Sequence, residues 1–460
     1  MLQTTPGCQS HRRLSCRRLR NRRARLRQRE FVRSLPLMWD TLTWHGWQSE
    51  SAPELCAAAH LADEPTLVVL CGNATPRGRF GIVAIPSTVR SLQATQDAII
   101  ALPQPGRCRV FLLGYEMGAA DVWLPVQTPP RRQPHGMVFD LGQALIVDHL
   151  RRRWTVAGAD EEKCRQLREA ASRTLVANLP SACVDLTPSV SDATHAVRIR
   201  AAQEHIKAGD IYQANVTRRL QLTPTFGADF AATTALIALQ RHNPVPHGAL
   251  IRHDGVEIVS NSMETLLTYE PTSGLAHSHP IKGTCARRPA EPTKPTLFAD
   301  AKECAEHAMI VDLVRNDLGK VCRPGTVRVP KLMDVEGYHG VWHGVSTAEG
   351  LLPNDRSTGE LIAALFPGGS ITGAPKRRAV DIIHTLEGES RGFYTGSIGL
   401  ITPRGRLSVS ILIRTLVRDA DGWSLSVGGG IVADSDPQRE LLETEEKIQV
   451  FREVLAASRP

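Results

Sequence analysis

The 460-residue sequence lacks the features that mark membrane, zinc-finger and disulfide-rich proteins. The longest apolar run near its start, residues 67–71, is far shorter than the ~20 residues of a spanning helix, so a membrane protein is not expected. Its ten cysteines form no Cys-x-x-Cys pair, which is typical of a protein in a reducing cytosol. No Gly-x-Gly-x-x-Gly motif follows an expected strand, which argues against a dinucleotide site. With 42% hydrophobic and 22% charged residues, we expect a soluble, cytoplasmic, globular chain.

The net charge of +8 arises from the N-terminal segment alone. Residues 1–33 contain eleven arginines and one acid, Glu30, which gives +10 and leaves −2 for the rest of the chain. An Arg-rich arm can bind phosphates, and organelle transit peptides are also Arg-rich and acid-poor. A solvated tail, or a start codon upstream of a true start at Met38, is the simpler interpretation. We expect no nucleic-acid partner and leave this segment out of the fold.

Strand and helix patterns alternate after residue 65 without a βαβ rhythm. Helices are expected over residues 161–179, 193–208, 229–240, 375–386 and 438–455, and within 301–322. Strands are expected over residues 66–72, 79–85, 109–118, 137–147, 154–156, 211–222, 248–253, 255–260, 392–401, 408–419 and 422–427. Long antiparallel strands with helices set aside predict an α+β fold. A Pro/Ser/Thr-containing connector at 182–191 predicts an N-terminal α+β half, residues 34–185, and a second half, residues 193–457.

Two Glu-x-x-Glu pairs lie on expected helices. Glu303 and Glu306 form the first pair, and Glu440 and Glu443 form the second, with Lys447 one turn further. Residues three apart share a helix face, so two such helices can bring four carboxylates to one place. Like charges that close require a cation, and oxygen-only ligands favour Mg²⁺. One such pair alone would be ordinary surface decoration, but two pairs beside anion-binding loops predict a Mg²⁺ site.

Two glycine-rich segments are candidates for those loops. Residues 367–378, PGGSITGAPKRR, enter an expected helix near Pro375, where free N–H groups and the helix dipole favour an anion. The glycine run 428–430 leaves an expected strand and would let a ligand touch the backbone. Arg414 lies in an otherwise apolar expected strand, and a buried arginine needs a carboxylate or phosphate partner. Each loop alone is equally consistent with a tight turn.

Seven motifs in order make the chain resemble the chorismate-utilising enzymes. They are PIKGT (280–284), EHAMIVDLVRNDLG (306–319), VWHGVST (341–347), GSITGAPK (369–376), FYTGSIG (393–399), IRT (413–415) and GGGIVADSDP (428–437). The resemblance is strong over residues ~193–455 and weak over ~65–180. It implies large antiparallel β-sheets packed together, helices on the outside, and chorismate as the substrate.

Lys282, in PIKGT, separates two branches of this family. The aminodeoxychorismate synthases of 4-aminobenzoate and folate biosynthesis carry Lys there, whereas the anthranilate synthases carry Ala. The resemblance to the first branch implies that Lys282 attacks ring C2 and expels the 4-hydroxyl, after which ammonia enters at C4. Such an amine must lose its proton, so the site would have to lower a pKa of ~10.4. A charge partner for a substrate carboxylate is the alternative role, and anthranilate synthase component I is the alternative activity.

The resemblance implies roles for further residues as well. Glu264 would protonate the departing hydroxyl, and His343 would shuttle a proton. Glu306 and Glu443 would bind Mg²⁺, with Glu303 and Glu440 beside them. The substrate carboxylates would be held by Gly283, Thr284, Tyr394, Arg414, Lys447 and the backbone of Gly428, Gly429 and Gly430.

The chain departs from the family pattern in places. Met263 replaces the usual Pro before Glu264, and residues 285–286 differ from the usual continuation of PIKGT. Gln213 stands where isochorismate synthases use Lys to activate water, which argues against a water-using enzyme. Residues 243–250 resemble a segment that lines a tryptophan pocket in relatives. No cysteine has a glutaminase context, so we expect a separate glutamine amidotransferase subunit to supply ammonia.

Overall fold

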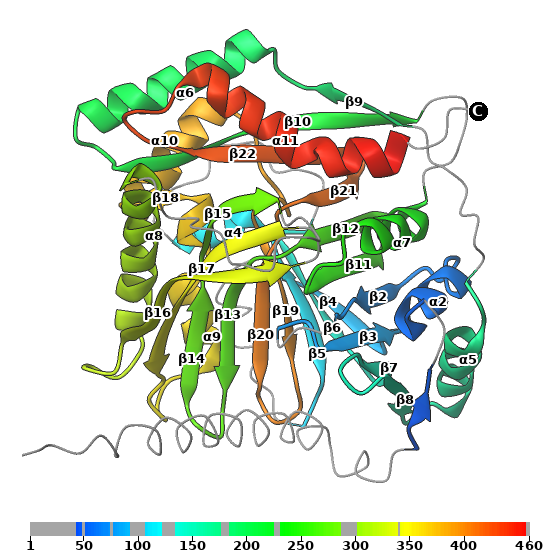
Figure 1. Ribbon diagram of the computed structural model, residues 1–460. Helices are drawn as coiled ribbons and strands as arrows, with labels where there is room; N and C mark the ends of the chain where they lie inside the picture. Colours follow the sequence, from blue (N-terminus) through cyan, green and yellow to red (C-terminus); the bar gives the residue numbers. More distant parts are fainter. Residues whose placement is uncertain are drawn as a thin grey trace, which may run out of the picture.

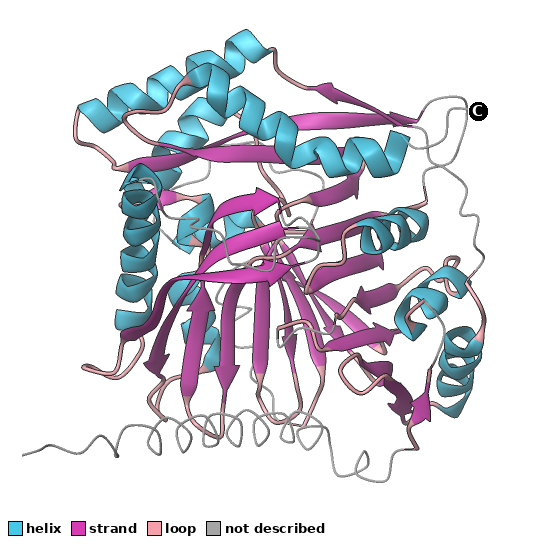
Figure 2. Cartoon of the chain, viewed as in Figure 1, coloured by secondary structure: helices cyan, strands magenta, loops and turns pink. Residues whose placement is uncertain are grey.

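The computed structural model describes residues 43–47, 51–73, 77–92, 106–121, 134–175, 184–224, 231–286, 301–338 and 341–456. The Arg-rich segment 1–33 lies outside these residues. Within them the strands form two large antiparallel sheets with helices on the outside, as the sequence predicts (Figures 1 and 2). No helix in these ranges combines the length and the apolar character needed to cross a membrane.

Sheet 1 has twelve strands in the described part of the chain. Their order is β1 (His45–Gly46), β8 (Arg153–Gly158), β7 (Gln143–Asp148), β3 (Phe80–Ala84), β2 (Leu67–Leu70), β11 (His247–His253), β12 (Val256–Ser262), β21 (Thr415–Asp419), β22 (Gly422–Ile431), β10 (Gln213–Pro224) and β18 (Gly373–Ala374), with β9 (Val184–Pro188) also paired to β10. Strands from before and after residue 185 therefore share this sheet, since β2 pairs with β11.

Sheet 2 has ten strands among the described residues. Their order is β15 (Ile281–Ala286), β17 (Val341–Leu351), β14 (Leu275–His279), β13 (Thr265–Glu270), β20 (Leu407–Ile411), β19 (Ser397–Ile401), β5 (Arg109–Leu113), β6 (Gly136–Asp140) and β4 (Thr88–Leu92), with β16 (Arg328–Tyr338) paired to β17. Here too the early and late parts of the chain meet, since β5 pairs with β19.

The helices cover the outer faces of the sheets (Figure 1). They are α2 (Pro53–His60), α4 (Tyr115–Asp121), α5 (Glu161–Ser172), α6 (Asp192–Lys207), α7 (Ala232–His242), α8 (Ala301–Gly319), α9 (Thr358–Leu365), the 3₁₀ turn η2 (Gly369–Ile371), α10 (Lys376–Glu387) and α11 (Pro437–Ala456). Local sequence sets their ends: Ser357 and Glu360 form a capping box before α9, and α10 stops at Gly388, whose φ of 65° suits glycine.

Three large apolar cores hold these layers together, and two smaller ones lie where α10 and α6 pack on β10. One lies between the sheets and joins Val68 and Ile251 of sheet 1 to Val110, Phe139 and Ile398 of sheet 2. A second packs the outer face of sheet 1 against α2, α5, α7 and α11, and a third packs sheet 2 against α8 and α9. Each fully buried Val, Leu or Ile contributes about 1.5–3 kcal/mol, so this packing is the main source of stability.

Several expected boundaries are wrong, and two of them share one physical reason. Residues 137–147 and 408–419, each expected as one strand, are two strands that lie in different sheets, β6 with β7 and β20 with β21. The hydrophobic pattern of a strand shows only which of its side chains are buried. Side chains on both faces stay buried where the chain crosses from one packed sheet to the other, so the pattern does not reveal the crossing. Residues 109–118 end in helix α4, and the connector at 182–191 contains β9.

Candidate active site

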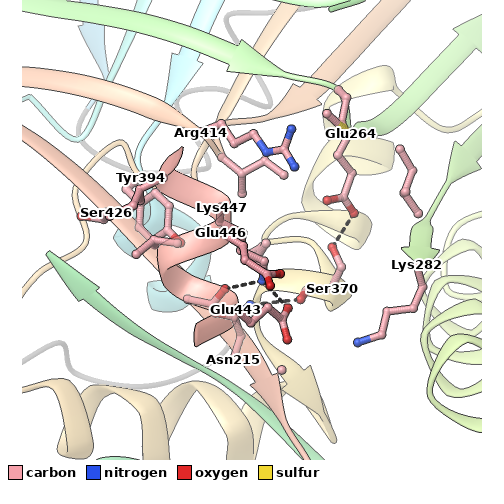
Figure 3. Close-up of a pocket in the computed structure, with 18 of the residues that line it drawn as sticks. Asn215, Glu264, Lys282, Ser370, Tyr394, Arg414, Ser426, Glu443, Glu446 and Lys447 are labelled. Atoms are coloured by element: carbon pink, nitrogen blue, oxygen red, sulfur yellow. Dashed lines mark hydrogen bonds and ion pairs between the residues drawn. The ribbon is translucent and has the colours of Figure 1, made fainter. Parts of the chain in front are cut away.

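One cavity of about 780 Å³ collects side chains from both sheets, η2, α8 and α11. It brings together ten of the predicted site residues, which line it from elements far apart in the sequence: Glu264, Lys282, Gly283, His343, Tyr394, Arg414, Gly428, Gly430, Glu443 and Lys447. Figure 3 shows Lys282 and Glu264 on one side of this space and the residues of α11 on the other. The side chains of Thr284 and Glu303 lie outside the described residues.

Lys282 projects from β15 toward α8, where its Nζ lies 2.6 Å from Oε2 of Glu306. Burial of the amine disfavours its charge, but the hydrogen bond and charge of Glu306, with Glu443 and Glu440 further off, outweigh burial and raise the pKa of Lys282. The structure therefore holds Lys282 as an ammonium ion. The lowered pKa expected for a nucleophile is not what this arrangement produces.

The carboxylates of α8 and α11 surround that ammonium. Glu443 pairs with Lys447 at 2.7 Å, and Glu306 is 13% exposed. Oxygen Oε2 of Glu440 is buried without a hydrogen-bond partner among the described residues, and burial raises the pKa of this carboxyl. No three His, Cys, Asp or Glu side chains within the described ranges already form a metal-binding group. The donors are nevertheless of the kind that Mg²⁺ takes, and the buried oxygen of Glu440 would gain a partner from a cation.

Glu264 follows β12, lines the cavity and contacts Ser370 of η2. Its side chain is 8% exposed, and the Ser370 hydroxyl donates a 2.7 Å hydrogen bond to its Oε1. Burial raises the pKa of Glu264, although Ser370, Lys447 and Arg414 partly offset the rise. A carboxyl group that keeps its proton at pH values above the usual titration range of glutamate can act as a general acid. The Met263 departure has not moved Glu264 out of the cavity.

His343, on β17, is a buried neutral imidazole. Burial, together with the charge of Arg414, lowers its pKa to about 4 despite a hydrogen bond with the backbone of Gly283. At neutral pH the ring is therefore uncharged and can accept a hydrogen bond in the cavity.

Arg414 lies between strands, not within one as expected. The chain leaves β20 in sheet 2 and enters β21 in sheet 1, and Arg414 at this crossing has a φ of 50°. Its guanidinium group points into the cavity and makes no hydrogen bond or ion pair with another described residue (Figure 3). A cation presented in this way suits an anionic ligand group. Tyr394, 5% exposed, lies on the same wall.

The three glycines 428–430 lie inside strand β22, not in a loop as expected, and pair with residues 215–217 of β10. Their other edge faces α11, where Lys447 donates a 2.7 Å hydrogen bond to the Gly428 carbonyl. A Cβ at Gly429 would stand 2.9 Å from Oε2 of Glu440, so a side chain there would displace this carboxylate.

Sequence reasoning missed some of the lining residues. Ser370 stood in the GSITGAPK motif with no role, yet it binds Glu264. Gln213, which the sequence singled out only as replacing a lysine, lines the cavity beside Gly430. Asn215 and Glu446 also line it. Nothing in their spacing singles them out, because only the fold brings β10 and α11 to the same wall.

Comparison with known proteins adds the family context. A family model described as chorismate binding enzyme matches residues 73–453. Anthranilate synthase component 1 1 of Haloarcula marismortui is 45% identical over 388 residues, covering 82% of this chain and 75% of that protein. Aminodeoxychorismate synthase component 1 of Klebsiella aerogenes is 37% identical over 343 residues, covering 73% of this chain and 74% of that protein.

Solved structures agree at the level of the fold. Anthranilate synthase component I from Streptococcus pneumoniae superposes with a TM-score of 0.71 at 24% identity, covering 83% of this chain and 93% of that one. MenF, the menaquinone-specific isochorismate synthase from Escherichia coli, gives a TM-score of 0.67 at 18% identity, with 90% and 94% covered.

Proposed function

Because the chain belongs to the chorismate-binding enzyme family, we propose that it converts chorismate and ammonia to 4-amino-4-deoxychorismate, the amination that leads to 4-aminobenzoate and folate. The observation that carries this choice is Lys282, whose amine enters the same cavity as the buried acid Glu264. A small residue at position 282 would leave no nucleophile on this wall.

The proposed chemistry has two substitutions. The neutral amine of Lys282 forms a bond to ring C2, both ring double bonds shift by one position, and the C4–oxygen bond breaks as Glu264 donates its proton and the hydroxyl leaves as water. The lysine nitrogen of this adduct carries a positive charge. Ammonia then forms a bond to C4, both double bonds shift back, and the bond from C2 to the lysine nitrogen breaks, so that Lys282 leaves as the neutral amine and the new amino group carries the charge. Glu264 regains its proton from solvent. The enolpyruvyl group takes no part in either step.

The residues around the chorismate ring have supporting roles in this proposal. Arg414, Tyr394 and the β22 backbone hold the substrate carboxylates, and neutral His343 accepts a hydrogen bond or proton. Glu306 and Glu443 would hold Mg²⁺, with Glu440 and Glu303 beside them, and the bound ion would supply positive charge for these carboxylates and a substrate carboxylate. Glu306 could then no longer stabilise the ammonium form of Lys282 as strongly. A separate glutamine amidotransferase would deliver the ammonia.

Anthranilate synthesis is the second candidate, because the Haloarcula relative at 45% identity carries that name. The two activities differ in one product: anthranilate formation releases pyruvate, whereas amination at C4 does not.

The test is to incubate the purified protein with chorismate, Mg²⁺ and ammonium, and to analyse products by liquid chromatography and mass spectrometry. We expect an aminated product that retains the enolpyruvyl group, with no pyruvate above the blank. Stoichiometric pyruvate and anthranilate would overturn the proposal in favour of the second candidate.

A further inference from the structure

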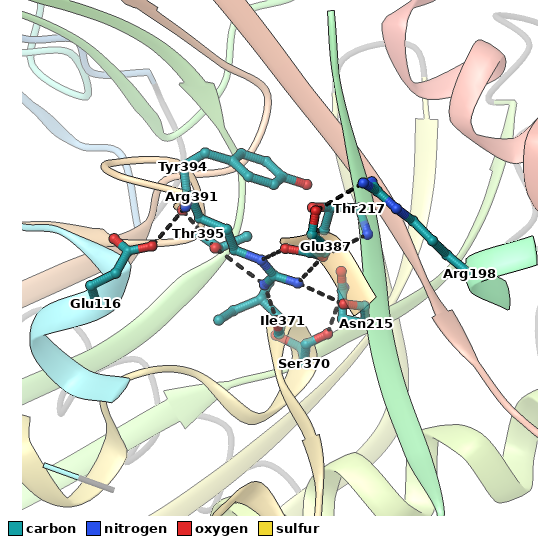
Figure 4. A network of polar contacts seen from close by, with 10 residues as sticks. All are labelled: Glu116, Arg198, Asn215, Thr217, Ser370, Ile371, Glu387, Arg391, Tyr394 and Thr395. Carbon is teal, nitrogen blue, oxygen red and sulfur yellow. Dashed lines mark hydrogen bonds and ion pairs between the residues drawn. The ribbon is translucent and has the colours of Figure 1, made fainter. Parts of the chain in front are cut away.

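A buried arginine behind the cavity wall joins several segments that line the cavity. Arg391 follows α10, is 4% exposed, and lines no part of the cavity itself. Its Nε donates to Oε2 of Glu387 at 2.8 Å and its Nη2 to Oε1 at 2.7 Å, a bidentate pair at the end of α10. Figure 4 shows this pair at the centre of a network of polar contacts.

The remaining donors of Arg391 bind backbone and side-chain oxygens of the wall. Nη2 donates to the Asn215 carbonyl at 2.7 Å, and Nη1 donates to the Ile371 carbonyl at 2.9 Å and to Oγ1 of Thr395 at 3.4 Å. Asn215 and Ile371 line the cavity, and Thr395 directly follows Tyr394, which also does. One guanidinium group thus connects β10, η2 and the turn before β19.

Two further contacts fix this centre from outside. Oε1 of Glu387 also accepts hydrogen bonds from the backbone N and Oγ1 of Thr217, at 2.9 and 2.8 Å. The Glu116 carboxylate, from α4, accepts the backbone N–H groups of Arg391 at 2.6 Å and Gly392 at 3.0 Å. The planar five-donor group is therefore held by protein on all sides, a geometry that a lysine cannot reproduce.

We propose that Arg391 is a positioning residue: by holding Ile371, Asn215 and Thr395 from behind, it keeps Ser370 on Glu264 and Tyr394 on the cavity wall. Ser370 immediately precedes Ile371, and its hydroxyl is the hydrogen-bond donor to Glu264. A shift of η2 would break that bond while leaving Glu264 itself in place between β12 and β13. The inference rests on the proposed role of Glu264 as the acid.

The test compares two double variants with the wild type. Arg391→Met/Glu387→Gln removes the guanidinium and the matching charge together, so no lone charge is buried, and the amide still accepts from Thr217. The matched control is Arg79→Met/Asp148→Asn, which removes a buried bidentate pair with distances of 2.8 and 2.7 Å whose residues do not line the cavity. Chorismate consumption gives kcat and KM across pH, and thermal unfolding gives Tm.

We expect the Arg391 variant to lose at least ~10-fold more kcat than the control, because small misplacements of reacting groups are costly. In the Arg391 variant, the alkaline limb of the pH–kcat profile should also move to higher pH. The Ser370 hydrogen bond favours the charged form of Glu264, and once this bond is lost only Lys447 and Arg414 still favour that form. The control should keep the wild-type limb even where its Tm falls. A purely structural role of Arg391 would change Tm without moving the limb.

A folded Arg391→Met/Glu387→Gln variant that has the kcat and the alkaline limb of the wild type would overturn the proposal. If the double variant does not fold, Arg391→Lys, which keeps a charge beside Glu387, should show the same signature in smaller degree. Failure of both to fold while the control folds would make Arg391 a stability element and equally overturn the proposal. Since consumption is read regardless of product, release of anthranilate by the wild type would refute the proposed function and leave this comparison valid.

Discussion

Replacing Glu264 by Gln isolates the proton from the shape of the cavity. The amide keeps an acceptor for the 2.7 Å hydrogen bond from Ser370 but has no proton to give to the leaving hydroxyl. General acid catalysis contributes ~10²–10⁴-fold, so kcat/KM should fall by that factor, which corresponds to about 2.7–5.5 kcal/mol of transition-state stabilisation. The affinity for chorismate should change little, because Arg414 and Tyr394 hold its carboxylates in this account.

The pH dependence follows from the raised pKa of Glu264, which burial causes. Wild-type activity should fall as pH rises through this raised value, since only the protonated acid can donate. The folded protein holds this proton to higher pH than the unfolded chain, with its pKa of ~4.3, so stability also falls as pH rises through the same window. Glu264→Gln should therefore have a higher Tm than the wild type at pH 8 and no such advantage at pH 4.

Ser370→Ala is the matched control for this prediction. It removes a hydrogen bond that favours the charged form of Glu264, so the alkaline limb of the pH–rate profile should move to higher pH while the acid remains. The assay is initial-rate chorismate consumption from pH 5 to 10 for the three proteins. A Glu264→Gln enzyme with wild-type kcat/KM, or one that retains the wild-type alkaline limb, would refute the reasoning.

The other expectations concern the carboxylates, the N-terminal segment and the amine. Glu306→Gln and Glu443→Gln should each lower turnover by at least ~10²-fold while circular dichroism stays unchanged; wild-type rates at limiting Mg²⁺ would disprove the metal assignment. Deleting residues 1–33 should leave activity and Tm unchanged, because the segment has no apolar pattern; a large drop in Tm would show that it packs. Lys282→Ala should lower 4-amino-4-deoxychorismate formation by ~10²-fold with chorismate still bound, and full activity would remove the nucleophile role.

Local patterns predicted most elements but not the sheet to which each strand belongs. The pattern at 193–208 predicted α6 to within one residue at each end, because a Ser191 cap and 3.6-residue periodicity are local signals. Residues 408–419 look like one strand because a run rich in Val, Ile, Leu and Thr continues through the crossing at Arg414. Which sheet receives each part depends on pairing with β13 and β12, which no local signal encodes.

The sequence predicted those residues of the candidate site that belong to recognisable motifs. Lys282, Glu264 and Arg414 were recognised from PIKGT, from the Glu after Met263 and from IRT, and the fold brings them to one cavity. Arg391 and Glu387 carried no motif role, because an ion pair behind a wall depends on the three-dimensional neighbours of β10 and η2. The ammonium state of Lys282 could not be predicted from the sequence either, since Glu306 contacts this side chain only because α8 packs on β15.

The most direct test of the account asks whether Lys282 bonds to the substrate. Wild-type protein is incubated with chorismate and Mg²⁺ without ammonia, and intact-protein mass spectrometry is followed by peptide mapping. We predict one adduct per chain, located on Lys282, absent from Lys282→Ala and discharged when ammonium is added. Turnover of chorismate to the C4-aminated product with no adduct on Lys282 would contradict the central claim.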